Sequence, residues 1–462
     1  MWVLPLIALL LWLGLLGIRA LGSGLSPAFY ALANLIVSLD LLDLLVRVWV
    51  TRHDRFAKRP RPTSIPLGIG PFTPHQIRLH TRPFAFVASV RNAGEELDDF
   101  LESMEPFRDC LYVIDDASTD ETFARLRRGG VHAVRSETNL KKPGAIRELL
   151  HELPADVETV VVLDPDVRIL DRGGRIRDIE RVIFEFQRSG CAAASPNVAV
   201  RPDGWLARLQ SLEYSLALGL GRRSLADRSI TSGVSIYRRD ALESALRDHS
   251  LSVYAEDLRN ALILLGRGER IYYDARFLIE TDAKRTWASW FSQRVGWHYG
   301  FIRVYLENFK DVWTASKGRP FFAYQFLVYL GLFGLVLQPL RLASVFVIAA
   351  STVNGAEGVF GLNLIPDSAA TAPGLFLFAY LKFTALTVVA SALATNGLRE
   401  WLSLQPVVPL YFFYAIAYVI PATLGYANWF TLRLMGRRVY RDHFHDEETD
   451  GSSAPPKGNG RS

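Results

Sequence analysis

The sequence predicts an α/β domain with a largely parallel, Rossmann-like sheet, inserted between groups of transmembrane helices. Half of the 462 residues are hydrophobic and 21% are charged, and the two classes are segregated along the chain. Between the apolar segments, residues 81–315 alternate short β-rich runs with helical runs and are long enough to bury a full core. One β-rich run ends in two carboxylates, Asp164 and Asp166, with a single proline between them.

Two apolar segments come first in the chain. Residues 2–18 are almost wholly apolar, and residues 28–46 are nearly so apart from Asp40 and Asp43. Each segment is about long enough to cross the ~30 Å hydrocarbon core of a bilayer. The first lacks the basic start of a signal peptide and the second follows closely, so residues 1–50 are predicted to form a retained transmembrane hairpin. The two acids lie either at an interface or inside the membrane, where acids are costly and often functional.

The charges and the cysteines indicate that the central domain is cytoplasmic. Residues 51–80 form a juxtamembrane linker whose positive charges mark the cytoplasmic side of a membrane; they are Arg52, Arg55, Lys58, Arg59 and Arg61. The two cysteines, Cys110 and Cys191, suggest no disulfide framework, which agrees with a reducing compartment. The net charge is +5, and several basic residues lie beside apolar segments. With no interleaved base-stacking pattern, this charge suits anionic lipid headgroups rather than nucleic acid.

The central domain is predicted from a regular alternation of patterns. The β-rich runs are residues 84–90, 111–115, 131–135 and 160–163, and the helical runs between them lie near 94–104, 120–128 and 143–153. This order predicts helices on both faces of the sheet, with ligands bound at the carboxyl ends of the strands. Polar residues fall at those ends: Ser89, Arg91 and Asn92, then Asp115 and Asp116, then Asp164 and Asp166. The sequence therefore predicts a site where these loops converge.

The two acids after the fourth β-rich run are candidate metal ligands. In an extended strand, positions i and i+2 point to the same side, and Pro165 fixes the backbone between Asp164 and Asp166. Neighbouring carboxylates repel unless a positive charge lies between them. A hard cation such as Mg²⁺ or Mn²⁺, itself carrying a substrate phosphate, supplies that charge. A solvated turn after a buried strand is the alternative interpretation.

Glu256 and Asp257 form a second candidate group. They precede an apolar helical run at residues 258–265. Acids at a helix N-terminus are favoured by the helix dipole, so capping alone would also explain them.

A third candidate group is an aromatic segment in which Gln293, Arg294 and Trp297 share one face of a predicted helix. An amide, a guanidinium and an indole on one face can hold a diphosphate and a flat sugar ring together. The rings around them, which are Trp287, Trp290, Phe291 and Phe301, indicate a helix along the membrane surface. The alternative is an aromatic interfacial helix without a binding role.

Residues 316–435 are predicted to form C-terminal transmembrane and interfacial helices, and residues 436–462 a disordered tail. The apolar segments are 321–350, 372–395 and 405–432. The basic residues Arg433, Arg437, Arg438 and Arg441 place the C-terminus in the cytoplasm, which requires an even number of crossings. Residues 321–350 therefore either divide into two crossings or contain an interfacial helix before a span, with another segment re-entrant.

Taken together, these motifs resemble the membrane-embedded family 2 glycosyltransferases, the group that includes cellulose, chitin and hyaluronan synthases. The resemblance covers most of the chain. The matching segments are Asp115–Thr122 (family Asp-Asp-Gly-Ser-x-Asp-x-Thr), Lys142–Ala145 (Lys-Ala-Gly), Asp164–Asp166 (metal-binding Asp-x-Asp), Ser232–Arg239 (the strand leading to the acceptor site), Glu256–Asp257 (Glu-Asp) and Gln293–Trp297 (Gln-x-x-Arg-Trp). Three residues depart from the pattern: Gly296 replaces an arginine, Ala117 a glycine and Ser89 a proline.

The resemblance implies a GT-A-like catalytic domain and a role for each candidate residue. Asp257 would be the general base, and Asp164 and Asp166 would bind Mg²⁺ or Mn²⁺. Substrate binding would fall to Ser89, Arg91, Asp116, Lys142, Glu256, Gln293, Arg294 and Trp297. Within that set, Asp116 would contact the nucleoside, Lys142 the diphosphate and Trp297 the acceptor sugar. Arg294 is the candidate to replace the diphosphate contact missing at Gly296.

The expected activity is inverting, metal-dependent transfer of a hexosyl unit from a nucleotide sugar, by resemblance a UDP-sugar, to a growing polysaccharide that is exported across the membrane. The imperfect Gln-x-x-Arg-Trp motif keeps open the transfer of a single sugar to a polyprenyl phosphate or another lipid. A membrane regulator that binds nucleotide sugars without turnover is the third hypothesis. Expected partners are the donor, a polysaccharide or lipid-linked acceptor and membrane lipids, with accessory export or regulatory subunits as further candidates. The protein is expected in the inner or plasma membrane.

Overall fold

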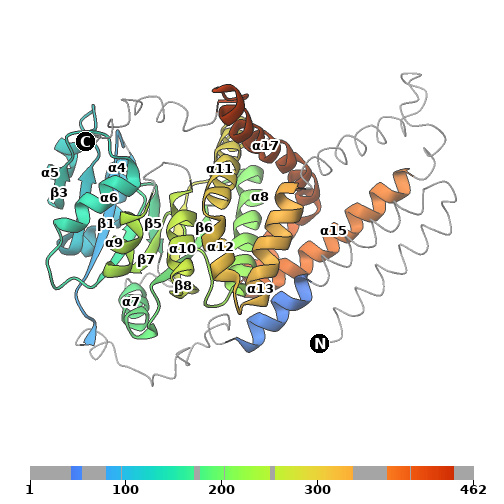
Figure 1. Ribbon diagram of the computed structural model, residues 1–462, viewed down its shortest axis with the longest axis horizontal. Helices are drawn as coiled ribbons and strands as arrows, with labels where there is room; N and C mark the ends of the chain where they lie inside the picture. The colour runs from blue at the N-terminus through green and yellow to red at the C-terminus, as the bar shows by residue number, and fades with distance from the viewer. Residues whose placement is uncertain are drawn as a thin grey trace, which may run out of the picture.

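The computed structural model has an α/β part built on one sheet and, beside it, a group of long helices (Figure 1). It describes residues 43–54, 80–94, 96–170, 177–201, 203–249, 255–336, 372–395 and 397–441. Most of the predicted N-terminal hairpin and linker, much of the segment 321–350 and the tail from residue 442 lie outside the described residues.

The sheet has eight strands in the order β3-β2-β1-β4-β7-β6-β8-β5. They are β1 (Phe84–Val90), β2 (Leu111–Asp115), β3 (His132–Arg135), β4 (Thr159–Leu163), β5 (Val167–Leu170), β6 (Ala193–Val200), β7 (Ser235–Arg238) and β8 (Ile271–Thr281). Strands β1 to β4 are parallel, but β7 runs antiparallel to both β4 and β6. The expectation of a largely parallel sheet is correct for the first half, and the sheet as a whole is mixed.

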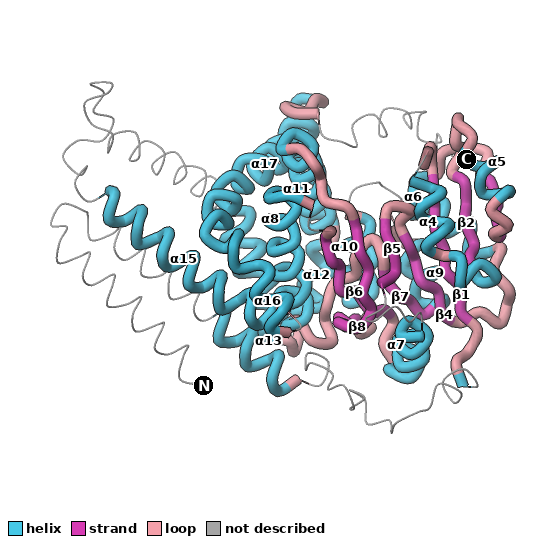
Figure 2. The backbone as a smooth tube through the Cα atoms, turned by 180° about the vertical axis from the view of Figure 1, so that it is seen from behind, coloured by secondary structure: helices cyan, strands magenta, loops and turns pink. Residues whose placement is uncertain are grey.

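Helices flank the strands and continue beyond them. Those of the α/β part are α4 (Glu96–Ser103), η1 (Glu105–Cys110), α5 (Thr122–Arg128), α6 (Lys141–His151), α7 (Arg177–Ser189), α9 (Arg239–Arg247), α10 (Glu256–Gly266) and α12 (Phe309–Ser316). The remainder are α8 (Gly204–Tyr214), η2 (Ser215–Arg222), α11 (Trp287–Glu307), α13 (Pro320–Ala323), η3 (Tyr324–Val336), α15 (Ala372–Ala394), α16 (Leu398–Leu404), η4 (Gln405–Val407) and α17 (Val408–Met435), with a further helix at residues 43–53. Seen from behind, the strands lie between helices and the second group stands to one side (Figure 2).

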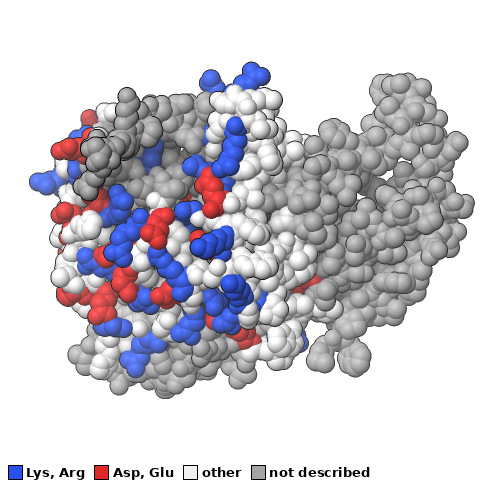
Figure 3. All heavy atoms as spheres, viewed as in Figure 1, with Lys and Arg blue, Asp and Glu red and all other residues white. Residues whose placement is uncertain are grey.

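Two apolar cores cover the two faces of the sheet. Side chains alternate along a strand, so Ala85 and Val87 of β1 join one core while Phe86 and Ala88 join the other. Helices α6, α9, α10 and α12 complete the first core, and α4, α5 and α7 complete the second. Helices on both faces confirm the predicted layering. On the face seen in Figure 3, charged side chains gather over α6, α9, α10 and α12.

The second group of helices is held by close packing between α11 and α17. A Cβ atom at Gly425 of α17 would lie 2.6 Å from the carbonyl oxygen of Val295 in α11, so glycine is needed for this approach. Trp290 of α11 is buried against Tyr414 and Tyr418 of α17. This ring therefore packs between helices, contrary to the expectation that it faces the membrane surface, whereas Trp287 is exposed.

Among the described residues, one helical stretch is long and apolar enough to cross a membrane, judged by length and composition alone: Leu398–Met435. A shorter apolar helix covers Tyr380–Ala394. Asp43, one of the two acids of the N-terminal segment, pairs with Arg47 (2.7 Å) and accepts a hydrogen bond from Gln325. The cost of burying this acid is therefore offset by direct partners.

Candidate active site

The ends of several strands meet at one edge of the sheet, as the sequence predicts. Val90, the last residue of β1, is paired with Asp115 at the end of β2, and β4 ends beside β1. Because β7 is antiparallel, its first residue, Ser235, lies opposite Val162 near the end of β4. The loops after β1, β2 and β4 and the loop before β7 therefore share this edge.

Asp116 follows β2 at this edge and holds the segment that leads into α6. It is buried, and its Oδ1 accepts hydrogen bonds from the Leu140 amide (2.6 Å) and the Ser136 hydroxyl (3.2 Å). Burial raises the pKa of Asp116, while those hydrogen bonds and the charge of Arg91 act to lower it. Asp116 thereby holds the residue that precedes α6. Ser89 is half-buried one position before the end of β1, on the face that α6 covers.

The next residue, Ala117, has a positive φ of 55°. A left-handed backbone strains a residue with a Cβ atom by roughly 1–2 kcal/mol, whereas glycine adopts it freely. The glycine of the family motif would relieve this strain, so the departure at Ala117 carries a local conformational cost rather than a change in chemistry.

Lys142, in the first turn of α6, connects three segments. Its ammonium donates hydrogen bonds to the Asp164 carboxylate and to the Gly233 carbonyl (3.0 Å), and it lies 3.6 Å from Glu256 Oε1. Burial acts to lower the pKa of Lys142, but the two carboxylates outweigh it and raise the pKa, so the ammonium stays charged. A Cβ atom at Gly233 would meet the Asp164 carboxylate, so a larger residue here would displace that side chain.

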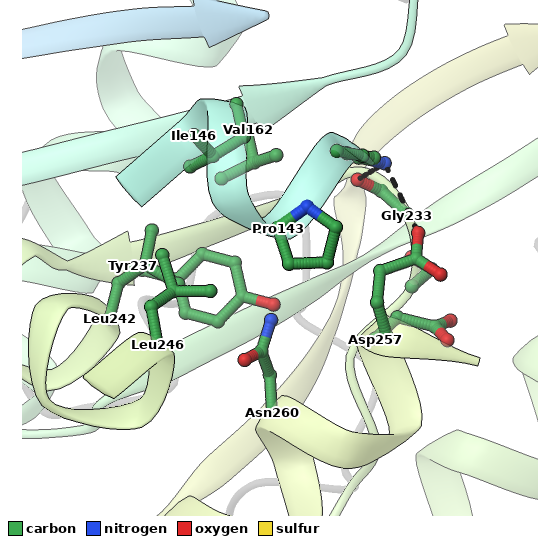
Figure 4. Close-up of a pocket in the computed structure, with 12 residues that line it drawn as sticks. Pro143, Ile146, Val162, Gly233, Tyr237, Leu242, Leu246, Asp257 and Asn260 are labelled. Carbon is green, nitrogen blue, oxygen red and sulfur yellow. Dashed lines mark hydrogen bonds and ion pairs between the residues drawn. The ribbon is translucent and has the colours of Figure 1, made fainter. Parts of the chain in front are cut away.

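A pocket opens beside Lys142 between α6, α9, α10 and the start of β7. Figure 4 shows apolar side chains at one end of it and Gly233 and Asp257 at the other. The Asn260 amide points toward the Tyr237 hydroxyl and Pro143 in the same view. The polar end of the pocket thus coincides with the cluster around Lys142.

The two candidate metal ligands lie on a turn. β4 ends at Leu163, and the amide of Val167 donates to the Asp164 carbonyl (3.4 Å) across Pro165 and Asp166. The two acids therefore do not continue the strand, as the sequence predicted, although both lie directly after its end. Asp164 is half-buried and Asp166 is exposed.

The donor chemistry of these two acids fits a hard divalent cation. Carboxylate oxygens are the ligands that Mg²⁺ and Mn²⁺ prefer, and Mg²⁺ commonly takes only one or two from the protein and the rest from phosphates and water. No group of three His, Cys, Asp or Glu side chains is gathered for a metal within the part of the chain that the structure describes. Asp164 and Asp166 would therefore hold a cation together with a substrate rather than alone.

Glu256 and Asp257 begin α10 after Ala255, whose φ is 52°. Burial raises the pKa of Glu256 to about 7; the charges of Asp257 and Asp164 add to the rise, and Lys142 opposes it. The N-cap residue Ala255 makes no side-chain capping bond, and both acids lie in the first turn of α10, where the helix dipole favours negative charge.

Asp257 has different partners from Glu256. Its Oδ1 accepts from the Leu258 amide (2.8 Å), and its Oδ2 lies 4.0 Å from Nη2 of Arg222. The Thr231 hydroxyl donates to its backbone carbonyl (2.7 Å). The two adjacent acids are therefore placed in distinct environments, one against an ammonium and the other against a guanidinium.

Gln293, Arg294 and Trp297 share one face of α11, as predicted, but the guanidinium is turned inward. Arg294 is fully buried, pairs with Glu213 of α8 (2.7 Å) and donates to the Gln293 side chain. It also stacks on the Trp297 ring at 4.1 Å, and this indole is 37% exposed and packs against Tyr214. Arg294 is paired with Glu213 in this structure, and the diphosphate contact that the sequence suggested for it stays a prediction.

Glu213 is further held from α17. The Tyr414 hydroxyl donates to Glu213 and accepts from Nε1 of Trp290 (2.6 Å). These residues form what we call the bundle cluster: Glu213, Trp290, Arg294 and Tyr414. The charged residues around Lys142 and Asp257 form what we call the cleft cluster: Lys142, Asp164, Asp166, Glu256, Asp257 and Arg222.

Sequence reasoning missed Glu213 and Arg222. Glu213 lies in α8 and Arg222 in η2, and no motif was recognised in either element. The available signal was a single acid and a terminal basic pair in a largely apolar helical stretch that also contains Arg208, since charged residues are almost never buried unless paired.

No protein-family model matches the chain. In sequence it is 24% identical over 214 residues to hyaluronan synthase 3 of Homo sapiens. The matched segment covers 42% of this chain and 38% of that protein. The Mus musculus hyaluronan synthase 3 is 24% identical over 208 residues, or 42% of this chain and 37% of that protein. The chain thus matches well under half the length of these curated relatives. The match confirms the resemblance to family 2 glycosyltransferases.

Similar solved structures include a mannosyltransferase, PcManGT, from Pyrobaculum calidifontis, determined with GDP-Man and Mn²⁺. It is 17% identical, with 91% of this chain and 98% of that chain covered and a TM-score of 0.46. Glucosyl-3-phosphoglycerate synthase from Mycobacterium tuberculosis is 16% identical, with 51% and 84% covered and a TM-score of 0.35.

Proposed function

We propose that this protein transfers a hexosyl unit from a nucleotide sugar to a growing polysaccharide, with inversion at the anomeric carbon. A UDP-sugar is the first candidate donor. The observation that carries this proposal is the cleft cluster. An ammonium, two strand-end carboxylates and two helix-start carboxylates come from three separate segments, and the Lys142 ammonium contacts one carboxylate from each of the other two as well as the Gly233 carbonyl. This is the combination that donor binding, leaving-group stabilisation and proton removal require.

The leaving group is a nucleoside diphosphate, and its developing negative charge must be neutralised. A bound Mg²⁺ or Mn²⁺ on Asp164 and Asp166 would supply most of that positive charge. Lys142 adds a fixed ammonium beside Asp164, and its raised pKa keeps it charged throughout the neutral range. Because both groups are in place before reaction, little reorganisation is needed.

The attacking hydroxyl of the acceptor must lose its proton as it reaches the anomeric carbon. Asp257 is our candidate general base, an effect worth about 10²–10⁴ in rate. Direct attack without an enzyme nucleophile inverts the anomeric centre. Trp297 would offer the exposed part of its indole to the terminal sugar of the acceptor. The Arg294 guanidinium stacks on the indole ring and fixes its orientation.

We further propose that the protein is an integral membrane protein whose residues 81–315 form the cytoplasmic catalytic domain. Residues 1–50 and 316–435 would lie in or on the membrane, with the tail from 436 in the cytoplasm. The apolar helical stretch Leu398–Met435 and the match to hyaluronan synthase 3 support this arrangement. Export of the polymer through the apolar helices is part of the same proposal.

The alternative is transfer of a single sugar to a polyprenyl phosphate or another lipid. Two observations favour it: Gly296 stands where the processive motif has an arginine, and Arg294 is occupied by Glu213. The arginine that would contact the leaving group in a complete motif has no counterpart at position 296.

One experiment separates these functions. The full chain, purified in detergent, is offered a panel of nucleotide sugars with Mg²⁺ or Mn²⁺, and both nucleoside diphosphate release and product size are measured. Long products support polymer synthesis, and a single addition to a supplied polyprenyl phosphate supports the alternative. Nucleotide binding without any release would overturn both and leave a binding protein without turnover. Asp164→Asn is the control for metal-dependent release.

A further inference from the structure

Arg222 occupies a place in the cleft cluster that no sequence motif accounts for. It ends η2; its Nη2 lies 4.0 Å from Asp257 Oδ2 and its Nη1 donates to the Ser195 hydroxyl (3.2 Å). The side chain is 22% exposed. A guanidinium keeps its charge in proteins, so a largely buried one requires an anionic partner. Among the described residues, the carboxylate that pairs with Arg222 is that of Asp257.

The backbone that carries Arg222 is fixed from outside the α/β part. Arg47, on the helix at residues 43–53, donates to the Gly221 carbonyl (3.3 Å) and the Ser224 hydroxyl (2.6 Å), on either side of Arg222. Earlier in η2, Gly219 lies directly against the Ala394 carbonyl of α15. The element is a π-helix, a form that is rare and often found at functional sites. Arg222 is thus presented from a rigid support.

The other charged and titratable groups around Asp257 leave this role to Arg222. Glu256 precedes it on α10, Asp164 comes from the end of β4 and Tyr237 from β7. The acids among them repel the Asp257 carboxylate. Lys142 of α6 is already bonded to Asp164 and Gly233 and lies beside Glu256. Lys142 also attracts the Asp257 carboxylate, but among the described residues Arg222 is the cation that lies within 4.0 Å of it.

We propose that Arg222 is a positioning residue that holds the Asp257 carboxylate in the orientation from which it accepts the proton of the acceptor hydroxyl. This inference rests on the proposed function. At 4.0 Å the pair attracts without a direct hydrogen bond. The carboxylate therefore keeps acceptor capacity for a substrate hydroxyl. Arg222 acts through Asp257 and contacts neither the donor nor the acceptor.

The test compares Arg222→Gln with Arg222→Lys in the full-length protein in detergent. Arg267→Gln is the matched control, because Arg267 lies at the opposite end of α10 and pairs with Asp248. We expect Arg222→Gln to lower kcat by about tenfold or more, as for loss of a partner of a charged group. Affinity for the nucleoside diphosphate should change by less than about twofold, because only the transfer step is affected. Arg222→Lys should recover most of the loss, and Arg267→Gln should behave as wild type.

A double variant separates this role from a structural one. In an Asp257→Asn background, Arg222→Gln should reduce the residual rate by less than about twofold, because both changes remove the same contribution. Losses that multiply would overturn the role of Arg222 alone. So would a tenfold loss of nucleoside diphosphate affinity, or a lysine variant that is no better than glutamine. A wild-type protein without transfer would overturn the proposed function, and the role of Arg222 with it.

Discussion

The cleft cluster and the bundle cluster both gather charged side chains from separate segments, yet they are built differently. In the bundle cluster one acid, Glu213, faces one cation, Arg294, and a hydroxyl and an indole N–H complete the hydrogen bonds. In the cleft cluster four carboxylates face two cations, and the groups remain partly exposed. A balanced ion pair inside a helix bundle can hold two helices together. An excess of one charge at a sheet edge leaves room for a ligand of the opposite sign.

The largest effect is expected from Asp164. Asp164→Asn should abolish metal-dependent release of nucleoside diphosphate, since an amide is a far weaker ligand for a hard cation. The thermal midpoint should change little, because the residue is half-buried at the end of a strand. Release assays across a Mn²⁺ titration, with a melting curve for each protein, measure both. Near wild-type turnover at limiting Mn²⁺ would show that the metal site lies elsewhere.

The second prediction concerns the base. Asp257→Asn keeps the shape of the side chain but cannot accept a proton, so transfer should fall by about 10²–10⁴. Nucleoside diphosphate binding should be unchanged. Single-turnover transfer and equilibrium binding distinguish the two steps, with Glu256→Gln as the neighbouring control. If binding is lost while transfer of bound donor survives, Asp257 belongs to the donor site and Glu256 becomes the candidate base.

Substitutions in the bundle cluster should lower the stability of the fold instead. Glu213→Gln leaves the buried Arg294 without its anionic partner, and breaking a buried pair costs about 3–5 kcal/mol. Its melting temperature should therefore drop far more than that of any cleft variant. The matched control is the double variant Glu213→Leu with Arg294→Met, which removes both charges and should regain much of the stability. A double variant as unstable as the single one would argue that the charges themselves are needed.

Trp297 lies beside the bundle cluster, stacked on Arg294 and packed against Tyr214, so its variant should give a smaller and different loss. Trp297→Ala removes an exposed indole, and aromatic contacts are worth about 0.5–1.5 kcal/mol beyond buried area. The KM for acceptor should rise by up to about tenfold and any polymer should be shorter. Slow hydrolysis of the donor by water should survive, because the cleft cluster is intact. Product sizing together with donor hydrolysis checks this; equal loss of both reactions would contradict it.

The smallest effect is a pH dependence from Glu256, whose pKa is raised to about 7 by burial. A carboxyl is ionised from about pH 4.3 in the unfolded chain, so between that pH and about 7 the folded state binds more protons. Stability from this group is present at low pH and is lost as the pH rises to about 7. Melting curves without added divalent cations should show this slope in the wild type and a shallower one in Glu256→Gln. Identical slopes would mean that Glu256 does not titrate in this window.

Much of the fold could be predicted because its signals are local. The strand Phe84–Val90 and the strand Leu111–Asp115 have the predicted bounds, and β3 and β4 differ from prediction by one residue at one end. Apolar runs of this length between helical patterns specify a βαβ unit, and the strand-end rule then brings Asp116 and Asp164 to one edge. Lys142 was found through its motif, at the start of a helix whose place was predicted.

Other features depended on contacts between distant parts of the chain. The antiparallel entry of β7, which brings Gly233 beside Asp164, has no local signature, because strand direction depends on the connection that precedes it. Arg294 meets Glu213 from 81 positions away, and Arg222 reaches Asp257 from another element. Sequence periodicity determines which residues share a helix face. Only the packing of one helix against another decides what that face meets, because the rotation and distance between helices are set by all the side chains in contact.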